Sequence, residues 1–273
     1  MDTAAPKRAA RKAESSSVLR ALARGGFAAN GVVHLLIGAI VIVISFGGRG
    51  ESDQAGAFMA IASAPLGFVA LWVLAVALCA LGIWHALEGL LARNTRDDAK
   101  GFAKKWGRRI SEWGQACIFI ALGVVAIAVA LGARVDSEES AENASHGILL
   151  LPGGPIMLGL LGLGIGIGGV SFVVMGVLRS FQKQLSIPSG TLGGVVTVLG
   201  VIGFIAKGVA LVIVGFLLVV AAATVDASTA GGLDGAIQAL LNVALGPLLV
   251  CLVGIGFIAY GVFCLFRARY ARL

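Results

Sequence analysis

Six apolar stretches, each long enough to cross a lipid bilayer, dominate this chain. They cover residues 28–46, 66–91, 115–131, 156–178, 198–223 and 245–266. About 20 apolar residues in a helix span the hydrocarbon core of a membrane. Only 13% of the 273 residues are charged, whereas about a quarter are charged in soluble domains. The sequence therefore predicts an all-α, multi-pass membrane protein with six transmembrane helices.

The distribution of Lys and Arg predicts how the chain is threaded. The N-terminal arm, the connections after the second and fourth spans, and the C-terminal tail hold 18 of the 21 basic residues. The opposite side carries most of the acids: Glu51, Asp53, Asp136, Glu138, Glu139, Glu142, Asp226 and Asp234. Because basic loops stay in the cytoplasm, we expect a cytoplasmic (plasma) membrane protein with both termini inside the cell. The net charge of +7 then predicts contact with anionic lipids and no nucleic-acid partner.

The N-terminal segment has a basic arm followed by an apolar run. We expect residues 1–19 to form a disordered basic arm and residues 18–24 to form a short interfacial helix. The apolar run is too long for a cleaved signal peptide, and no small-residue cleavage site follows it. All four cysteines lie inside spans, where a thiol usually packs as a small hydrophobic group.

An internal repeat organises the spans. Residues 26–32 align with residues 203–209 and, more loosely, with the segment around Gln115. The chain therefore divides into three repeats of two spans each, at residues 20–95, 105–185 and 195–273. Because two spans return the chain to the same side, these are parallel repeats. Small residues let membrane helices pack closely, and the repeat predicts two sets of such contacts: Gly38, Gly123 and Gly215, and Gly82, Gly176 and Gly261.

The repeat motifs resemble a known family. Residues 206–209 (Ala-Lys-Gly-Val), residues 232–236, Gly246-Pro247, Tyr260-Gly261 and residues 268–270 are similar to the bacterial membrane family called domain of unknown function 1206. The resemblance covers nearly all of residues 24–273 and implies three tandem two-helix modules. It implies no active site. The chain departs from the family pattern in its acidic loop at residues 136–147, and in having Asn30 and Gln115 where the third repeat has Lys207.

Polar side chains inside spans are the default places to look for function. Asn30, Gln115 and Lys207 occupy equivalent repeat positions, and His34, His85 and Glu88 form a second polar layer near the same side. One interpretation is structural, with long side chains reaching the headgroups and amides bonding across helices. The other is a polar ring around a pseudo-threefold axis, at the base of a cytoplasm-facing vestibule.

The sequence suggests few chemical activities. His34 and His85 could in principle ligate a haem, although packed histidines are the simpler interpretation, and we expect no cofactor and no metal site. No hydrolytic, metalloprotease or P-loop motif occurs, so we predict no catalytic residues. Two functions remain. One is a non-catalytic scaffold or accessory subunit with a membrane-protein partner, and the other is a small-solute or lipid-handling transporter or channel.

Overall fold

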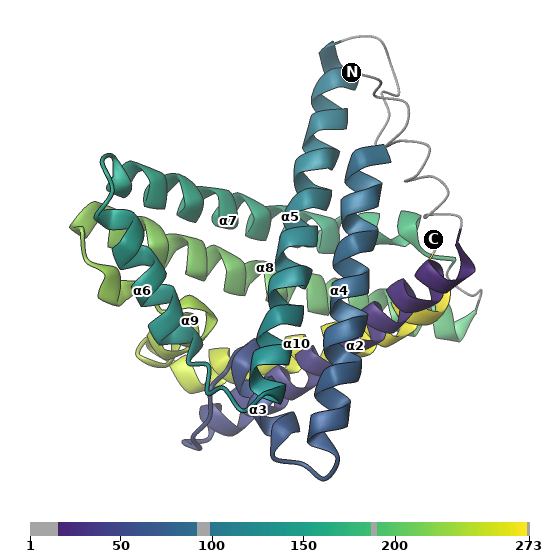
Figure 1. Ribbon diagram of the computed structural model, residues 1–273, viewed down its shortest axis with the longest axis horizontal. Helices are drawn as coiled ribbons and strands as arrows, with labels where there is room; N and C mark the ends of the chain where they lie inside the picture. Colours follow the sequence, from purple (N-terminus) through teal and green to yellow (C-terminus); the bar gives the residue numbers. More distant parts are fainter. Residues whose placement is uncertain (1–15, 92–98, 187–189, 272–273) are drawn as a thin grey trace.

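Six long helices form the body of the protein in the computed structural model (Figure 1), which describes residues 16–91, 99–186 and 190–271. Each contains a stretch apolar enough to cross a membrane, which confirms the predicted all-α, six-span class. The helices are α2 (Ser17–Ser45), α4 (Gly67–Leu91), α5 (Ala99–Ala130), α7 (Gly154–Val177), α8 (Thr191–Thr224) and α10 (Gly246–Tyr270).

The first helix differs from expectation at its beginning. Residues 1–15 of the predicted arm lie outside the described residues. Residues 18–24, predicted as a separate interfacial helix, are instead the first turns of α2. No proline interrupts residues 17–45, so the helical hydrogen bonds continue without a break.

The six helices pack as a row of three close pairs. α4 packs along α5, α2 along α10, and α7 along α8. The pairs are joined by α2 against α4 and by α10 against α8, which gives the order α5–α4–α2–α10–α8–α7. In Figure 1, α4 and α5 stand upright, α7 and α8 run across the view, and α2 and α10 pass diagonally between them. The helices α5 and α7 are consecutive spans, separated in the chain by the short α6, yet they lie at opposite ends of this row.

Each close pair joins two different repeats through the same kind of glycine contact. On α2 and α10, a Cβ added at Gly31 would lie 2.8 Å from the carbonyl oxygen of Gly261, and one added at Gly38 would lie 2.7 Å from that of Gly254. On both helices the two glycines are seven residues apart. Backbone therefore touches backbone, the arrangement that small residues permit in membranes.

The same spacing recurs in the other two pairs. Gly162 and Gly169 of α7 contact Gly215 and Gly208 of α8. On α4 and α5, Gly82 lies against Ala116, and Gly123 lies against Ala75 and Cys79. The α7 residue equivalent to Gly82 and Gly261 is therefore Gly169. Gly176, which the repeat in the sequence predicts at this contact, lies seven residues later; it too contacts α8, against Val201 and Phe204, but it is not the residue equivalent to Gly82 and Gly261.

Three short helices cover the side of the row on which the C-terminal ends of α2, α5 and α8 lie. They are α3 (Gln54–Ala62), α6 (Ser137–Leu149) and α9 (Gly232–Leu241), and they lie on the lower left of Figure 1. We call this layer the acidic cap. We call the opposite side of the row, where α2, α5 and α8 begin, the basic end. Asp53 and Asp136 accept backbone hydrogen bonds at the starts of α3 and α6, so both carboxylates act as N-caps.

An equivalent left-handed residue precedes the second span of every repeat. It is Leu66 in the first repeat, Gly153 in the second and Leu245 in the third, with φ of 63°, 77° and 62°. The following glycine in each case, Gly67, Gly154 or Gly246, sits against the carbonyl groups of the preceding short helix. These three turns fix the register of α4, α7 and α10 relative to one another.

Candidate functional site: two polar clusters in the helix row

The first polar cluster lies where α2, α8 and α10 meet. The Lys207 ammonium is 3.3 Å from His34 Nε2, and His34 Nδ1 is 2.8 Å from the backbone oxygen of Asn30. A carbonyl oxygen only accepts hydrogen bonds, so Nδ1 carries the proton and Nε2 accepts from Lys207. The geometry therefore describes a neutral imidazole that holds a lysine cation.

Aromatic and sulfur groups complete this cluster. The Lys207 ammonium lies 4.5 Å from the ring centroid of Tyr260 and 5.5 Å from that of Phe172, within the range of cation–π attraction. The Asn30 amide is 3.5 Å from the Cys264 sulfur. Lys207 forms no ion pair with any carboxylate in the described part of the chain. We call Asn30, His34, Lys207, Tyr260 and Cys264 the lysine cluster.

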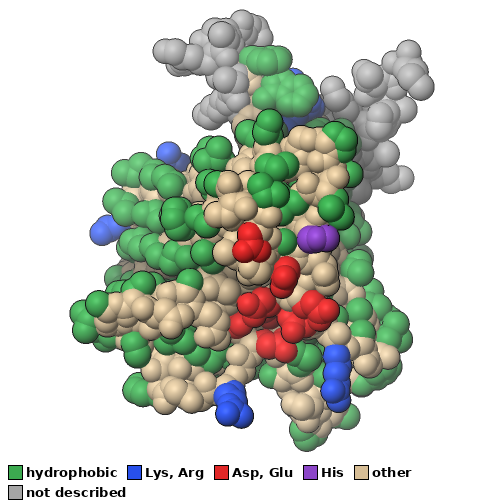
Figure 2. Space-filling model, turned by 90° about the vertical axis from the view of Figure 1, so that its left-hand side faces the viewer, with side chains coloured by type: hydrophobic (Ala, Val, Ile, Leu, Met, Phe, Trp, Pro, Cys, Tyr) green, Lys and Arg blue, Asp and Glu red, His purple; other side chains and the backbone are tan. Residues whose placement is uncertain are grey.

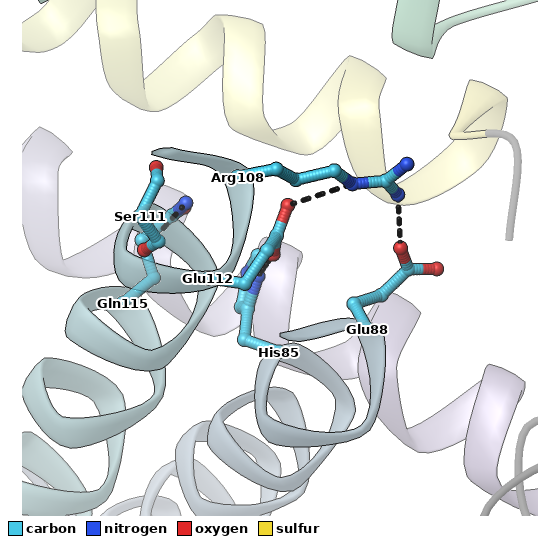
Figure 3. A network of polar contacts seen from close by, with 6 residues as sticks. All are labelled: His85, Glu88, Arg108, Ser111, Glu112 and Gln115. Carbon is cyan, nitrogen blue, oxygen red and sulfur yellow. Dashed lines mark hydrogen bonds and ion pairs between the residues drawn. The ribbon is translucent and has the colours of Figure 1, made fainter. Parts of the chain in front are cut away.

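The second cluster lies between α4 and α5 (Figure 3). His85 Nδ1 is 2.8 Å from a carboxylate oxygen of Glu112, and Arg108 pairs with Glu88. The other oxygen of Glu112 is 4.0 Å from Arg108 Nε. The His85 ring stacks on Phe119 at a centroid distance of 5.5 Å, and its Nε2 is buried without a hydrogen-bond partner among the described residues. We call His85, Glu88, Arg108 and Glu112 the histidine–glutamate cluster.

Phe27 of α2 stands between the two clusters. The His85 ring meets it edge-on at a centroid distance of 6.3 Å. The Arg267 guanidinium, one turn beyond Cys264 on α10, lies 4.3 Å from the Phe27 centroid. A single layer of polar and aromatic contacts therefore crosses α5, α4, α2, α10 and α8 on the basic half of the row.

The structure regroups the residues predicted from the sequence. It brings Asn30, His34 and Lys207 together, and it places His85 and Glu88 in the histidine–glutamate cluster. Gln115 joins neither group, because its amide lies 3.5 Å from the backbone oxygen of Ser111 on its own helix. The two histidines contact different rings and different charged partners: His34 lies beside Tyr260 and Lys207, and His85 beside Phe119 and Glu112. No group of three or more metal-binding side chains occurs among the described residues.

Sequence reasoning missed Arg108 and Glu112. Both residues precede the predicted third span, because the apolar run begins only at residue 115, whereas α5 begins at Ala99. Their spacing of four residues is the one that pairs opposite charges along a helix. That spacing, together with the absence of Pro between residues 99 and 115, was the available signal for a longer helix.

The acidic cap gathers carboxylates on one face, which is visible as a red patch in Figure 2. Burial raises the pKa of Asp53 and of Glu51, and repulsion from neighbouring carboxylates raises both further. Burial and the nearby Asp234 and Asp136 also raise the pKa of Glu138. Asp234 accepts hydrogen bonds from the backbone and the hydroxyl of Ser52, at 2.8 and 2.5 Å, which joins the first repeat to the third.

A cavity of about 500 Å³ opens at the basic end, beside α8. Arg179, Gln182 and Thr197 supply its polar lining, and the Gln182 amide donates to the Thr197 hydroxyl at 2.9 Å. Lys207 does not line this cavity. The lysine cluster is instead packed among helices, with Asn30 and His34 each 3% exposed.

Comparison with known proteins agrees with the repeat architecture. The profile of the family described as Domain of Unknown Function (DUF1206) matches residues 25–92, 113–179 and 202–271. An uncharacterized protein of Bacillus subtilis (strain 168), YxxB, is 24% identical over 264 residues, which is 96% of this chain and 94% of that protein. No solved structure matches the chain.

Proposed function

This chain belongs to the DUF1206 family, and from that premise we propose that it is a non-catalytic membrane scaffold or accessory subunit. It binds other transmembrane helices through the helix faces that its own row leaves open. On this proposal the two polar clusters stabilise the packing of the helices, because most of their hydrogen bonds and ion pairs join members of the same cluster.

The observation that carries the proposal is that much of the surface of α7 is not covered by another helix. Over the described residues, α8 is the transmembrane helix that packs along α7, and the buried residues of α7 form a single narrow face that includes Leu158, Gly162 and Gly169. Cβ atoms added at Gly164 and Gly168 would meet nothing within 4 Å. Glycine faces associate membrane helices through close backbone approach, so this open face is suited to another helix.

The threading proposed for the chain follows from its charges. With the basic end in the cytoplasm, both termini lie inside the cell, and the acidic cap lies outside the cytoplasmic membrane. Arg179 and the other cations of the basic end would then meet anionic lipid headgroups. A reporter fused after residue 273 tests this orientation, because activity on the outer side of the membrane would contradict it.

The scaffold proposal is tested by purification in a mild detergent, followed by quantitative mass spectrometry of retained proteins. We expect a membrane protein, or a further copy of this chain, to remain bound in a fixed ratio. A Gly164→Leu variant should lose that component, while the matched Leu163→Phe variant, with a larger side chain on another exposed part of α7, should keep it. A chain that purifies alone from native membranes, under conditions that preserve known complexes, would refute the proposal.

A transporter is the second candidate, and the lysine cluster is what favours it. A cation held by a neutral imidazole and aromatic faces, with no described carboxylate beside it, can attract an anionic solute or headgroup. The test is anion uptake and lipid-headgroup retention in vesicles containing the Lys207→Met variant. Uptake and retention equal to those of the unmodified protein would remove this candidate, provided that the variant unfolds at the same temperature.

A further inference from the structure

The cavity at the basic end lies where α7 and α8 pass from apolar to polar surroundings. Its volume of about 500 Å³ is within the range of small-molecule sites. Its lining combines three polar side chains with three apolar ones: Arg179, Gln182, Thr197, Val198, Val201 and Ile202. The apolar stretch of α7 ends at residue 178 and that of α8 begins at residue 198, so the polar lining lies at headgroup level and the apolar lining borders the hydrocarbon. The cavity therefore suits a ligand that is polar at one end and apolar at the other.

The short 3-10 turn η1 (Ser180–Gln184) anchors the polar side of this cavity. Phe181 is 2% exposed, and its ring fits against α8, where a Cβ added at Gly200 would lie 2.5 Å from it. Arg179 directly precedes η1, and Gln182 follows Phe181 within it and donates a hydrogen bond to α8. The buried phenylalanine therefore positions both polar side chains beside the cavity.

Arg179 brings to the cavity a positive charge that the described chain does not pair with a carboxylate. It forms no ion pair among the described residues. The sequence explains why, because no Asp or Glu occurs between residues 143 and 225 or after residue 234. The two acids in this half of the chain, Asp226 and Asp234, follow the C-terminal end of α8 on the side of the acidic cap. The charge of Arg179 is thus available to an anionic ligand.

The third repeat leaves space at positions where the other repeats carry long cations. Thr197 and Val201 of α8, counted from the aligned residues 31, 116 and 208, correspond to basic residues of α2 and α5: Arg20, Arg24, Lys105 and Arg109. In α8 the two shorter side chains line the cavity. The third repeat therefore combines an open space with one arginine from the preceding turn, an arrangement that an anionic ligand can complete.

We propose that this cavity binds an anionic phospholipid, with the headgroup phosphate at Arg179 and an acyl chain along Val198 and Ile202. A guanidinium forms paired, charge-assisted hydrogen bonds with phosphate oxygens. The first N–H groups of α8 lie at the edge of the same cavity, next to Gly190, and no side chain caps them, so they add donors that favour an anion. Val198 and Ile202 are 57% and 43% exposed, so an acyl chain reaches them from the bilayer.

A phosphate group can reach the site as part of a lipid or as a soluble anion, and the apolar lining favours the lipid. A soluble phosphate would pair with Arg179 but leave Val198, Val201 and Ile202 without a contact. An acyl chain covers these side chains and removes apolar surface from water. The inference concerns a ligand and not a protein partner, so it goes beyond the scaffold proposal and does not depend on it.

Native mass spectrometry of the full chain in detergent micelles tests the inference. The chain is delipidated and titrated with dioleoyl phosphatidylglycerol, or with dioleoyl phosphatidylcholine, which has the same acyl chains and no net charge. We expect a single phosphatidylglycerol to bind each chain, with an affinity at least about tenfold above that of phosphatidylcholine. Arg179→Gln should weaken the binding of phosphatidylglycerol at least about tenfold. The matched Lys183→Gln removes a charge from the same turn, outside the cavity lining, and should change the affinity by less than about twofold.

A second variant tests the cavity by filling it. Gly194 lines the cavity, and a Cβ added there would meet nothing within 4 Å, so Gly194→Leu places a side chain in the cavity without forcing the helices apart. We expect this variant to bind phosphatidylglycerol at least about tenfold more weakly, while its unfolding temperature stays near that of the parent. Gly107→Leu on α5, whose added Cβ also faces open space, should bind the lipid as the parent does.

Three results would overturn the inference. Equal affinities of the Arg179→Gln and Lys183→Gln variants for phosphatidylglycerol would exclude the cavity as the binding site. Equal affinities for the two lipids would show that the charge of the headgroup is not recognised. Displacement of phosphatidylglycerol by an excess of inorganic phosphate would show that the site takes a soluble anion and not a lipid. None of these results bears on the scaffold proposal, which is tested by the retained proteins alone.

Discussion

Two glycines three residues apart on α7 should respond in opposite ways to the same substitution. Gly169 faces α8, where an added Cβ would lie 2.7 Å from the carbonyl oxygen of Gly208 and 2.7 Å from the backbone nitrogen of Val212. The backbone of Gly166 also lies close to α8, beside Gly215, but a Cβ added at Gly166 would point away from it and meet nothing within 4 Å. Both residues lie in the middle of the same helix, so the gain in helix propensity from alanine is the same, about 0.5–1 kcal/mol.

The difference between the variants comes from the contact with α8. Backbone atoms cannot rotate away, so Gly169→Ala must push α7 and α8 apart by several tenths of an ångström. A gap of that size forfeits a sizeable part of each van der Waals contact, and overpacking of this kind costs about 1–3 kcal/mol. In the part of the chain that the structure describes, no second transmembrane helix packs along α7, so the loss is not compensated by another helix contact.

We therefore expect Gly169→Ala to lower the free energy of unfolding by about 1–2 kcal/mol after the propensity gain. Gly166→Ala should raise it by about 0.5–1 kcal/mol. Reversible unfolding in mixed micelles, followed by circular dichroism, measures both. A change of the same sign in both variants would contradict the finding that a side chain at residue 169 points into the contact with α8 and one at residue 166 points away from it.

Three further predictions concern the turns, the lysine cluster and the acidic cap. Leu66→Gly should raise the free energy of unfolding by about 1 kcal/mol, because the left-handed φ of 63° strains a leucine but not a glycine; thermal unfolding should show no gain for the matched Phe68→Gly, whose position lies inside α4. His34→Leu should destabilise the protein more than Lys207→Met, since it leaves an ammonium without its acceptor, and the double variant should recover part of the loss, so an additive double-mutant cycle would contradict the contact. The raised pKa values of Glu51, Asp53 and Glu138 mean that the folded cap binds protons more tightly than the unfolded chain. The resulting stability is fully present below the ordinary carboxyl pKa values and is lost as the pH rises through the raised ones. The unfolding temperature should thus increase from about pH 7 to about pH 5, less so in Glu138→Gln, and an unchanged or falling temperature would contradict the pKa directions.

The number and identity of the spans could be predicted from the sequence, because hydropathy over about 20 residues follows directly from the thickness of a bilayer. Their pairing could be predicted only in part. Gly38, Gly123 and Gly215 all lie at helix contacts, as the repeat indicated. The predicted equivalence of Gly176 with Gly82 was wrong. Because α7 has a glycine in most of its turns, the sequence alone does not show which of them aligns with Gly82.

The sequence does not show which of the polar residues in the spans come together in space. Repeat equivalence placed Asn30, Gln115 and Lys207 at one level, and a symmetric arrangement would bring them together. In the row, α5 lies at the far end from α8, so Gln115 lies apart from Lys207. The order of the helices in the row depends on side-chain packing between them, which hydropathy does not register.

The most direct test of this account compares two equivalent cysteine pairs across helices of the same repeat, in the membrane. Ala206 and Gly256 lie in contact between α8 and α10, whereas the equivalent residues Gly114 and Gly164 each face open space on α5 and α7. With the exposed Cys117 removed, we predict that Ala206→Cys/Gly256→Cys forms an intramolecular disulfide under mild oxidation, once the helices separate from the 2.1 Å between the two Cβ positions to the roughly 3.5–4.5 Å that a disulfide needs. Gly114→Cys/Gly164→Cys should form none. An equally rapid intramolecular disulfide in the second pair would show that the helix row is closed, contrary to the arrangement described.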